Sequence, residues 1–540
     1  MKINKKATKE NRAEKEQVKH GHLNHMHGVS YDIHNPIKQL RIVASSCFFG
    51  EPMYYHDDTS REVSSVSSKE NLYGKYLSEE LGSVISIPEY RKYSASKLVE
   101  TSIDAALDYD AEKTLQEAVR LRNEENMRVT PQVIMVRAAN HPKIRGTGLV
   151  KKYASQILVR TDEAATQLAY QTQVYGRPIP NALKKAWKVF LEKCSEYQLA
   201  KYRLEAKAFK TLDVVNLVHA HSDAIDKLMT GTLKLDNSTW ESNISQNGST
   251  KENWEKSIVL MGHMALLRNI ANFEKNGVSP DKYIDKLIET AASGKQLPFR
   301  YFSAYKAAES ANVSGRVLDA IETCLEESIG RLPRFEGRVM SLCDNSGSAH
   351  GAFTSTAGTM TVAQIANLTA ILTGKASDDG YIGIFGDKLE VKPVRKKDSV
   401  FTALKEANSI GKGIGAGTEN GVWLFFDQAI KNKEHWDSIF VYSDMQAGHG
   451  GLYGTTPSQY RDYIWEASLG RTSGRHIDVA KLVKTYRKEV NPNVKVFLVQ
   501  VAGYKDTLVP EFYDKTYILG GWGDGLLRFA KEMSSLDEQS

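Results

Sequence analysis

The apolar residues of this 540-residue chain change their spacing near residue 335, and that change constrains the possible folds more than any other feature. Before it, apolar side chains recur at helical spacing almost throughout, as at Leu183, Trp187 and Leu191. After it, short apolar runs alternate with amphipathic helical stretches. The sequence therefore predicts two different architectures, one following the other.

The first part is predicted to be all-helical. Helices are expected at 99–127, 130–141, 153–172, 180–191, 196–209, 212–222, 254–275, 279–293, 302–310 and 314–330. Many helices in succession, with no strand pattern between them, are typical of antiparallel helices stacked in pairs, as in a HEAT-like solenoid. No fixed sequence period is visible, so this prediction rests on the number of helices alone.

The second part is predicted to be a doubly wound α/β domain. Strands are expected at 338–343, 381–386, 389–394, 438–443, 495–502 and 516–520, with helices at about 359–374, 401–410, 422–432, 459–469, 476–490 and 525–536. Strands that are nearly continuous apolar runs indicate a mostly parallel sheet covered on both faces. In such sheets ligands bind beyond the carboxyl ends of the strands, near the point where the strand order reverses.

Five oxygen-bearing side chains fall at such strand ends and loops. Asp344, Ser346 and Ser348 follow the first strand, Thr418 precedes a helix, and Asp444 follows a central strand. Carboxylates and hydroxyls are hard donors that suit Mg²⁺ or Mn²⁺. Each residue alone could instead be a helix cap or a turn residue, and the joint occurrence favours a divalent cation site.

The glycine-rich stretch 411–417 has a competing interpretation as a dinucleotide-binding loop. That fingerprint should follow a strand and open a helix, whereas here a helical pattern precedes it. No Gly-Lys-Ser or Gly-Lys-Thr occurs there, so it is not a Walker loop either. Nucleotide binding through this stretch is disfavoured.

One helical stretch is unusually basic. Between Asn181 and Lys210 three acidic residues face eight basic ones, namely Lys184, Lys185, Lys188, Lys193, Lys201, Arg203, Lys207 and Lys210, with Tyr197, Tyr202 and His219 nearby. Clustered Lys and Arg bind phosphates, and unpaired bases stack on aromatic rings, so this pattern favours RNA. The alternative is a solvated helix face, which explains most runs of charge.

The bulk composition excludes several classes of protein. The formal net charge of +6 is mild, so an anionic partner must be met by a local patch. Four scattered cysteines and the absence of a long apolar run predict reduced thiols in a cytoplasmic protein with no membrane contact. Residues 1–29 are polar and contain four histidines; they are predicted to be a disordered basic tail, able to contact a transition metal or an acidic partner.

Several of these motifs resemble a known family. The Asp344–Ser348 motif with Thr418 and Asp444 resembles the metal-ion-dependent adhesion site of von Willebrand factor A domains. Upstream, three stretches resemble the TROVE module of Ro autoantigen proteins: Leu121–Pro131, Arg160–Glu163 and Leu297–Lys306. TROVE followed by an A domain is the Ro arrangement. The chain thus resembles a bacterial or phage-type Ro homologue, with a tail at 1–29, a TROVE module at 30–335 and an A domain at 336–540.

The resemblance implies a monomeric ring of HEAT-like helices closed by the A domain. It implies Y-like noncoding RNA on the outer basic surface, single-stranded ends of misfolded RNA in the ring's hole, and an exoribonuclease such as polynucleotide phosphorylase as a partner. The family's RNA-contacting positions correspond best to Lys201 and His219, and less well to Arg203 and Lys207, because the spacing is one residue longer here. A second departure is Ala349-His350 in place of the family's Met.

Three functions remain open at this point. The first is a non-catalytic RNA-binding scaffold with a divalent cation, acting in RNA quality control or processing. The second is a Mg²⁺-dependent protein-interaction module for which the helices are a spacer. The third and weaker one is a metal-dependent phosphohydrolase, for which His350 is the nearby base.

Overall fold

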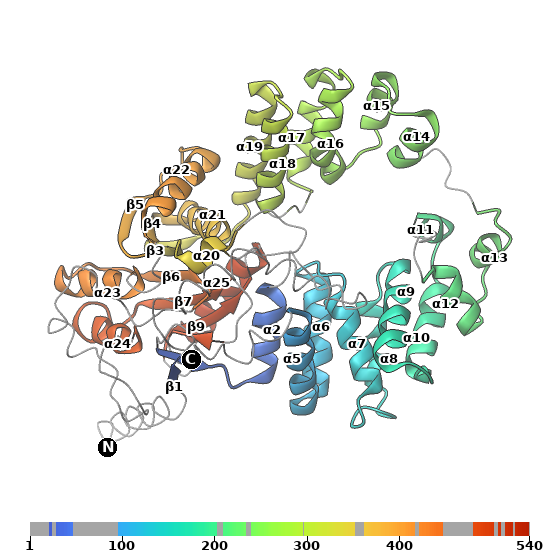
Figure 1. Cartoon of the computed structure of the whole chain (residues 1–540), viewed down its shortest axis with the longest axis horizontal. Coiled ribbons are helices and arrows are strands. Elements are labelled where there is room, and N and C mark those ends of the chain that lie inside the picture. Colours follow the sequence, from blue (N-terminus) through green and yellow to red (C-terminus); the bar gives the residue numbers. More distant parts are fainter. Residues whose placement is uncertain are drawn as a thin grey trace, which may run out of the picture. The chain divides into compact units, whose positions relative to one another are not determined.

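The chain forms two compact units in its computed structural model (Figure 1). The sheet unit comprises Met1–Tyr109 and Pro333–Ser540, and the helical unit comprises Asp110–Leu332. The structure describes residues 21–23, 29–46, 95–201, 209–233, 239–294, 296, 298–351, 361–415, 421–445, 479–501, 506–508, 514–521 and 524–538. The boundary after Leu332 lies close to the predicted one, whereas the start of the helical unit lies much later than residue 30.

The helical unit contains no strand among its described residues, as predicted. Its helices are α6 (Ala111–Asn123), α7 (Thr130–Asn140), α8 (Leu149–Ile157), α9 (Thr161–Tyr170), the π-helix η3 (Gln171–Tyr175), α10 (Asn181–Leu191), α11 (Glu196–Lys201), α12 (Thr211–Val218), α13 (Asp223–Met229), α14 (Trp240–Asn247), α15 (Lys251–Ile258), α16 (His263–Lys275), the 3₁₀ turn η4 (Pro280–Lys282), α17 (Ile284–Ala291), α18 (Pro298–Ser310) and α19 (Gly315–Ile329). Helices close in sequence pack against each other, for example α6 on α7, α8 on α10 and α17 on α19 (Figure 1). This is the pairwise stacking expected of a HEAT-like array.

Three predicted helices are each divided into two, so their predicted continuity was wrong. The first divides at Asp110, whose carboxylate accepts a hydrogen bond from the Lys113 backbone N–H at 3.0 Å and caps α6. The second divides after α8, because Glu163 caps α9, and the third divides before α16 at Gly262. Helical periodicity continues on both sides of such caps, which is why the spacing of apolar residues alone missed them.

The sheet unit has a six-stranded sheet of the predicted doubly wound class. Its strands are β3 (Phe335–Asp344), β4 (Ser377–Phe385), β5 (Leu389–Pro393), β6 (Ser438–Ser443), β7 (Lys495–Gln500) and β9 (Thr516–Gly520). They lie in the order β5-β4-β3-β6-β7-β9, and every neighbouring pair is parallel except β4 with β5. The strand order therefore reverses between β3 and β6.

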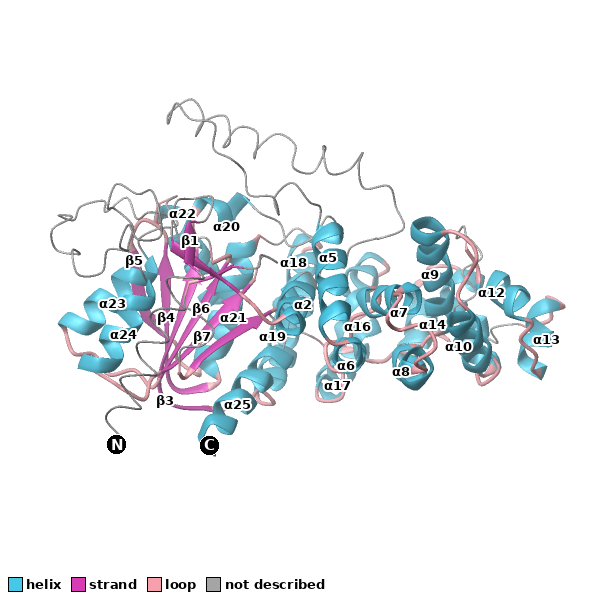
Figure 2. Ribbon diagram, turned by 90° about the horizontal axis from the view of Figure 1, so that it is seen from below, coloured by secondary structure: helices cyan, strands magenta, loops and turns pink. Residues whose placement is uncertain are grey.

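Helices cover both faces of this sheet (Figure 2). They are α20 (Gly347–Gly351), α21 (Val362–Lys375), α22 (Val400–Gly413), α23 (Gly421–Lys431), α24 (Val479–Glu489) and α25 (Asp524–Glu538). Along β6, Ile439 and Val441 belong to the core that contains residues of α23 and α24, whereas Tyr442 points to the other face and makes a 2.5 Å hydrogen bond with Thr373 of α21. Burial on both faces explains why the strands read as uninterrupted apolar runs.

The start of the chain belongs to the sheet unit, which was not predicted from the sequence. Helix α2 (Pro36–Ser46) packs on β9 and on α5 (Ala95–Tyr109), and Arg41 lies 4.9 Å from the ring centroid of Phe529 in α25. Strands β1 (Gly21–Leu23), β2 (Val29–Asp32) and β8 (Asp506–Thr507) form a small antiparallel sheet.

The predicted disordered tail at 1–29 was therefore wrong at Gly21–Leu23, because backbone pairing with β2 orders this strand without requiring much apolar burial. Residues 1–20 and 24–28 lie outside the described residues. None of the described helices is long and apolar enough to cross a membrane.

Candidate metal centre and nucleic-acid interface

Two carboxylates lie at the point where the strand order of the sheet reverses. Asp344 ends β3, and Asp444 directly follows the neighbouring β6; both are almost fully buried. This is the position at which doubly wound sheets bind ligands. Because β3 and β6 are parallel neighbours, their carboxyl ends lie at the same edge of the sheet, and the two aspartates come together there as predicted.

The Asp344 carboxylate is held by its surroundings. Its Oδ1 accepts a hydrogen bond from the Ser346 backbone N–H at 2.9 Å, and its Oδ2 accepts one from the Ser443 hydroxyl at 2.5 Å. Burial, and secondly the negative charge of Asp444, raise the pKa of the Asp344 carboxyl to about 7, although the hydrogen bonds from Ser443 and Ser346 oppose the rise. A divalent cation would relieve both causes, because it stabilises the charged form of each carboxylate.

The loop that carries Asp344 is anchored by a buried amide ladder. Asn345 donates to Asn367 of α21 at 2.7 Å, and Asn367 donates back to Asn345 and to Asn408 of α22, both at 2.9 Å. Gly411 of α22 is required here, because a Cβ atom at this position would run into the Asn345 amide oxygen. No sequence signal pointed to this ladder, since Asn367 and Asn408 lie inside helices far from the motif.

The remaining predicted metal donors are only partly described. Ser346 is buried beside Asp344, and its hydroxyl also bonds that carboxylate. Ser348 lies in α20, but its side chain is not among those described, and Thr418 lies outside the described residues. Among the described residues no group of three or more His, Cys, Asp or Glu side chains could hold a metal. Two carboxylates with hydroxyl oxygens fit Mg²⁺ or Mn²⁺ rather than a softer metal.

His350 contacts the backbone next to this site. One ring nitrogen lies 3.2 Å from the Gly411 carbonyl oxygen, and burial, followed by the positive charge of Lys412, lowers the pKa of the ring. His350 therefore connects α20 to α22. That nitrogen is already engaged by protein, so the geometry adds no support to His350 as the base of a phosphohydrolase.

The predicted RNA-binding lysines of α10 lie on its outer face. Leu183, Trp187 and Leu191 are fully buried, as their helical spacing predicted. Lys185 is exposed, and Lys184 and Lys188 are half-buried.

The other predicted RNA-binding residues lie on α11 and at the two ends of α12. Lys201 donates to the Tyr197 hydroxyl at 3.1 Å, its ammonium lies 5.4 Å from that ring's centroid, and 47% of Tyr197 is exposed. Lys210 is exposed just before α12, and His219 is exposed just after it, with φ of 48°. Arg203 and Lys207 lie outside the described residues.

The structure separates these basic residues into two groups. Glu192, which follows α10, accepts a hydrogen bond from the His221 backbone N–H at 3.1 Å, so the carboxyl ends of α10 and α12 are adjacent and His219 lies near them. The helix of Lys201 packs on α13, which begins just after His219. Lys184 and Lys185 occupy the first turn of α10, and eleven residues of helix span about 16 Å. His219 thus lies near the carboxyl end of α10, away from Lys184 and Lys185, and Lys201 lies on the helix that packs against α13, which follows His219.

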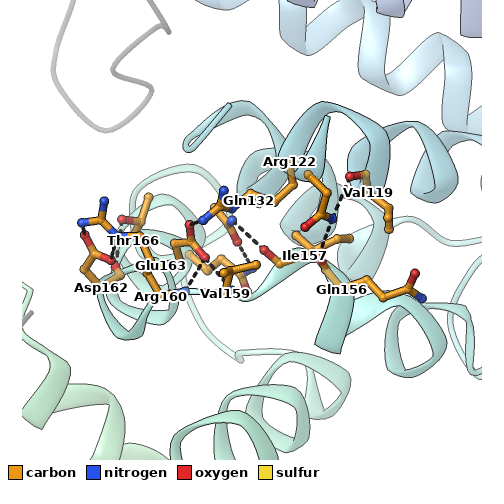
Figure 3. A network of polar contacts seen from close by, with 12 residues as sticks. Val119, Arg122, Gln132, Gln156, Ile157, Val159, Arg160, Asp162, Glu163 and Thr166 are labelled. Atoms are coloured by element: carbon orange, nitrogen blue, oxygen red, sulfur yellow. Dashed lines mark hydrogen bonds and ion pairs between the residues drawn. The ribbon is translucent and has the colours of Figure 1, made fainter. Parts of the chain in front are cut away.

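Two of the three stretches that resemble TROVE meet in a buried polar network (Figure 3). Arg122 of α6 pairs with Glu163 of α9 at 2.7 Å, and both side chains are almost fully buried. The other Glu163 oxygen accepts from the Val159 and Arg160 backbone N–H groups at 2.8 and 2.9 Å. Burial raises the pKa of Glu163 in spite of Arg122, so desolvation outweighs the attraction between the two charges. These motif residues hold helices together.

Glutamine side chains extend the network to α10. Gln167 donates to Gln132 at 2.7 Å and accepts from the Trp187 indole N–H at 2.7 Å, so α7, α9 and α10 are joined by buried hydrogen bonds. Gln132 in turn donates to the Ile157 carbonyl oxygen at 3.2 Å (Figure 3). Buried hydrogen-bond networks of this kind fix the relative positions of helices.

The third TROVE-like stretch forms α18 and brings positive charges together. The pKa of Arg300 is lowered, first by burial and then by the positive charges of Arg128 and Arg268. Each of the three side chains keeps solvent contact, Arg300 while partly covered by its neighbours, and they come from three separate segments of the helical unit. Sequence analysis did not single them out as binding residues, although Arg128 and Arg300 lie inside the stretches that carried the resemblance. Clustered arginines favour an anion.

Comparisons with known proteins agree with this architecture. Residues 222–328 match the family model of the TROVE domain. The fold resembles the crystal structure of the Ro (RSR) protein of Deinococcus radiodurans, with a TM-score of 0.54 and 14% sequence identity over 80% of this chain and 93% of that one. No curated protein sequence matches the chain. The predicted TROVE resemblance and the predicted combination of a helical array with an α/β sheet are confirmed.

Proposed function

We propose that this chain is a non-catalytic RNA-binding scaffold, because residues 222–328 match the TROVE domain and the fold resembles that of a Ro protein. One observation carries the proposal: Lys201 contacts the exposed ring of Tyr197, and its helix packs against α13, which begins just after His219 near the carboxyl end of α10. An ammonium beside an exposed aromatic ring suits RNA, because the cation neutralises phosphate and the ring stacks on an unpaired base.

We propose further that this end of α10 binds a structured, Y-like noncoding RNA. Single-stranded ends of misfolded RNA are a second ligand, and the arginines Arg128, Arg268 and Arg300 supply positive charge for them. The partner in RNA processing is an exoribonuclease such as polynucleotide phosphorylase. The protein acts as a cytoplasmic monomer.

RNA binding at the Lys201 end can be tested with a double variant. Lys201→Ala with His219→Ala should weaken binding of a hairpin RNA more than binding of a single-stranded oligonucleotide. Each phosphate that is no longer neutralised lowers the slope of log K against log salt by about 1. Lys388→Ala, at an exposed position between β4 and β5, is the matched control and should change neither affinity. If the wild-type protein bound no RNA at low salt, the proposed function would be wrong.

We propose that the sheet unit holds Mg²⁺ or Mn²⁺ through Asp344, Ser346, Ser348, Thr418 and Asp444. The support is the pair of buried carboxylates with Ser346 beside them. Such ions keep open positions, which water or an outside carboxylate can fill. A second function follows: the ion mediates docking of a partner protein through an acidic side chain.

Metal-dependent docking has its own test. Partner proteins captured on the full-length chain should be lost in EDTA and in Asp344→Ala, and should be retained after ribonuclease treatment. Isothermal titration with Mg²⁺ alone should give heat with the wild type and none with the variant. Capture that survives EDTA but disappears after ribonuclease would assign the partner to the RNA instead.

A further inference from the structure

The segment 126–191 is far more basic than the chain as a whole. It contains eleven Lys and Arg residues but only two acidic residues, Asp162 and Glu163. Both are already neutralised: Glu163 is buried against Arg122, and Asp162 accepts from the Arg160 guanidinium at 2.9 Å. Two of the other basic residues pair with carboxylates outside the segment: Lys152 with Glu112 at 2.5 Å and Lys188 with Glu192 at 3.8 Å. The segment itself still carries a large excess of positive charge. Charge imbalance on this scale favours a polyanionic partner.

A π-helix interrupts the segment and is held by specific hydrogen bonds. Helix α9 continues into η3, a conformation that is rare and is often found at functional sites. Asn140, at the end of α7, donates to Gln171 at 2.6 Å, and Gln171 donates to the Gly176 carbonyl oxygen at 3.2 Å. The end of α7 and the π-helix therefore lie side by side, and Figure 1 shows α7, α8, α9 and α10 as neighbours.

These contacts present one aromatic ring to solvent. Tyr175, the last residue of the π-helix, is 37% exposed. Its ring meets Tyr170 edge-on at 6.4 Å, and the Arg137 guanidinium carbon lies 5.9 Å from its centroid. Arg137 is itself fixed, because it donates to the Tyr170 hydroxyl at 2.6 Å. The ring is thus positioned from behind by a cation and by a second ring, and the rest of it remains accessible.

Exposed basic residues follow both segments that meet at this ring, the end of α7 and the π-helix. Arg177 follows it by two residues, and the loop that leaves the end of α7 carries Lys143 and Arg145, all exposed. The first turn of α10, with Lys184 and Lys185, follows shortly after. Arg177, Lys184 and Lys185 thus lie at or just before the amino end of α10, whereas the chain just after His219 meets its carboxyl end.

We propose that Arg137, Arg145, Tyr175 and Arg177, here called the π-helix patch, form a further RNA-binding site, made of other residues than the Lys201 end of α10 and the arginines Arg128, Arg268 and Arg300. It binds a single strand by stacking one base on Tyr175. Arg145 and Arg177 neutralise the flanking phosphates, and Arg137 holds the ring in place. Any base can stack on an aromatic ring, so the site should select RNA with unpaired bases and show little preference for a particular sequence. The proposal rests on the proposed RNA-binding function and extends it to a separate surface.

The test uses the full-length protein and a ten-nucleotide single-stranded oligouridylate. Base stacking on an aromatic residue contributes about 1–3 kcal/mol, so Tyr175→Ala should weaken binding by about 5- to 150-fold. Tyr175→Phe keeps the ring and should bind like the wild type. Arg145→Glu and Arg177→Glu should each weaken binding and reduce its salt dependence by about one ion. Affinity for a fully paired hairpin should fall in the Lys201→Ala variant and stay unchanged in Tyr175→Ala.

A second measurement changes the oligonucleotide instead of the protein. An oligonucleotide of the same length made wholly of abasic units keeps the phosphates but offers no base, and the wild type should bind it as weakly as Tyr175→Ala binds oligouridylate. For Tyr175→Ala itself, removing the bases should have little further effect. Equal wild-type affinity for both oligonucleotides, or displacement by polyglutamate with no dependence on bases, would overturn the proposal. A wild type that binds neither oligonucleotide nor hairpin would instead overturn the proposed function.

Discussion

Removal of the Glu163 carboxylate tests whether the buried network of Figure 3 is structural. In Glu163→Ala the Arg122 guanidinium stays in a site where its side chain is only 9% exposed, without its partner at 2.7 Å. The backbone N–H groups of Val159 and Arg160 also lose their acceptor at the start of α9. Both consequences act in the same direction, toward a less stable helical unit.

The expected cost follows from the burial of the pair. Leaving one partner of a buried ion pair unpaired costs about 3–5 kcal/mol, and loss of a helix cap costs about 1 kcal/mol, although the two do not add fully. For a unit of the size of Asp110–Leu332, each kcal/mol shifts Tm by about 2–4 °C, so a decrease of roughly 6–20 °C is expected. Asp162→Ala is the matched control: its pair with Arg160 is about 20% exposed and should contribute less than about 1 kcal/mol.

The assay has to report on the helical unit alone, because a chain with two units need not unfold in one step. Hydrogen exchange followed by mass spectrometry measures opening of α6, α7 and α9 separately from the sheet. A double variant, Arg122→Met with Glu163→Gln, adds a decisive comparison. Gln still accepts from the two backbone N–H groups, and no charge remains buried, so this variant should be much closer to the wild type than Glu163→Ala.

Two results would refute this reasoning. If Glu163→Ala opened no faster than Asp162→Ala, the buried pair would not hold the helices together. If the double variant were as unstable as the single one, the cost would arise from poorer side-chain packing rather than from an unpaired buried charge.

Three other substitutions have outcomes that the structure predicts. Asp344→Asn should raise Tm in EDTA, because Asp444 then no longer faces a second buried carboxylate. The same substitution should abolish the stabilisation by Mg²⁺, which is expected to reach about 2.7 kcal/mol in the wild type at a hundredfold excess over Kd. Thermal melts with and without Mg²⁺ measure both effects. Burial lowers the pKa of His263 below the unfolded value of 6.5. The neutral ring therefore contributes fully to stability above pH 6.5, and this contribution is lost as the pH falls below 6.5. Urea unfolding measured against pH should show that the pH dependence is removed in His263→Gln and unchanged in His219→Ala. Gly294→Ala should cost about 1–3 kcal/mol in urea unfolding, because its Cβ would lie 2.5 Å from Cδ2 of the His263 ring.

Much of the sheet could be predicted from the sequence. Strands β6 and β9 have the predicted bounds residue for residue, because apolar runs buried on both faces end sharply at polar turns. The convergence of Asp344 and Asp444 followed from parallel strands whose carboxyl ends share one edge. These features depend on local sequence patterns and on the rule that the carboxyl ends of parallel strands share one edge of the sheet, and neither depends on contacts between distant segments.

The features that were missed depend on contacts between distant segments. Nothing local indicates that α2 packs on β9, or that Asn367 supports the loop after Asp344. The basic residues of 181–210 looked like one cluster because they are close in sequence. The length of α10 places Lys184 and Lys201 apart, since a helix converts proximity in sequence into separation along its axis.

The two proposed binding sites differ in charge, and this determines where metal dependence should be found. The helical unit presents exposed lysines and arginines, whereas the ligand edge of the sheet buries two carboxylates that raise each other's free energy when both are charged. Without a bound cation, Asp344 and Asp444 would repel both phosphates and acidic side chains. With the proposed Mg²⁺ bound, the same site would attract a carboxylate. RNA affinity should therefore depend on monovalent salt and hardly on EDTA, while protein docking at Asp344 should depend on Mg²⁺ and little on salt. If EDTA abolished hairpin binding as completely as it abolished protein docking, the RNA surface and the metal site could not be independent.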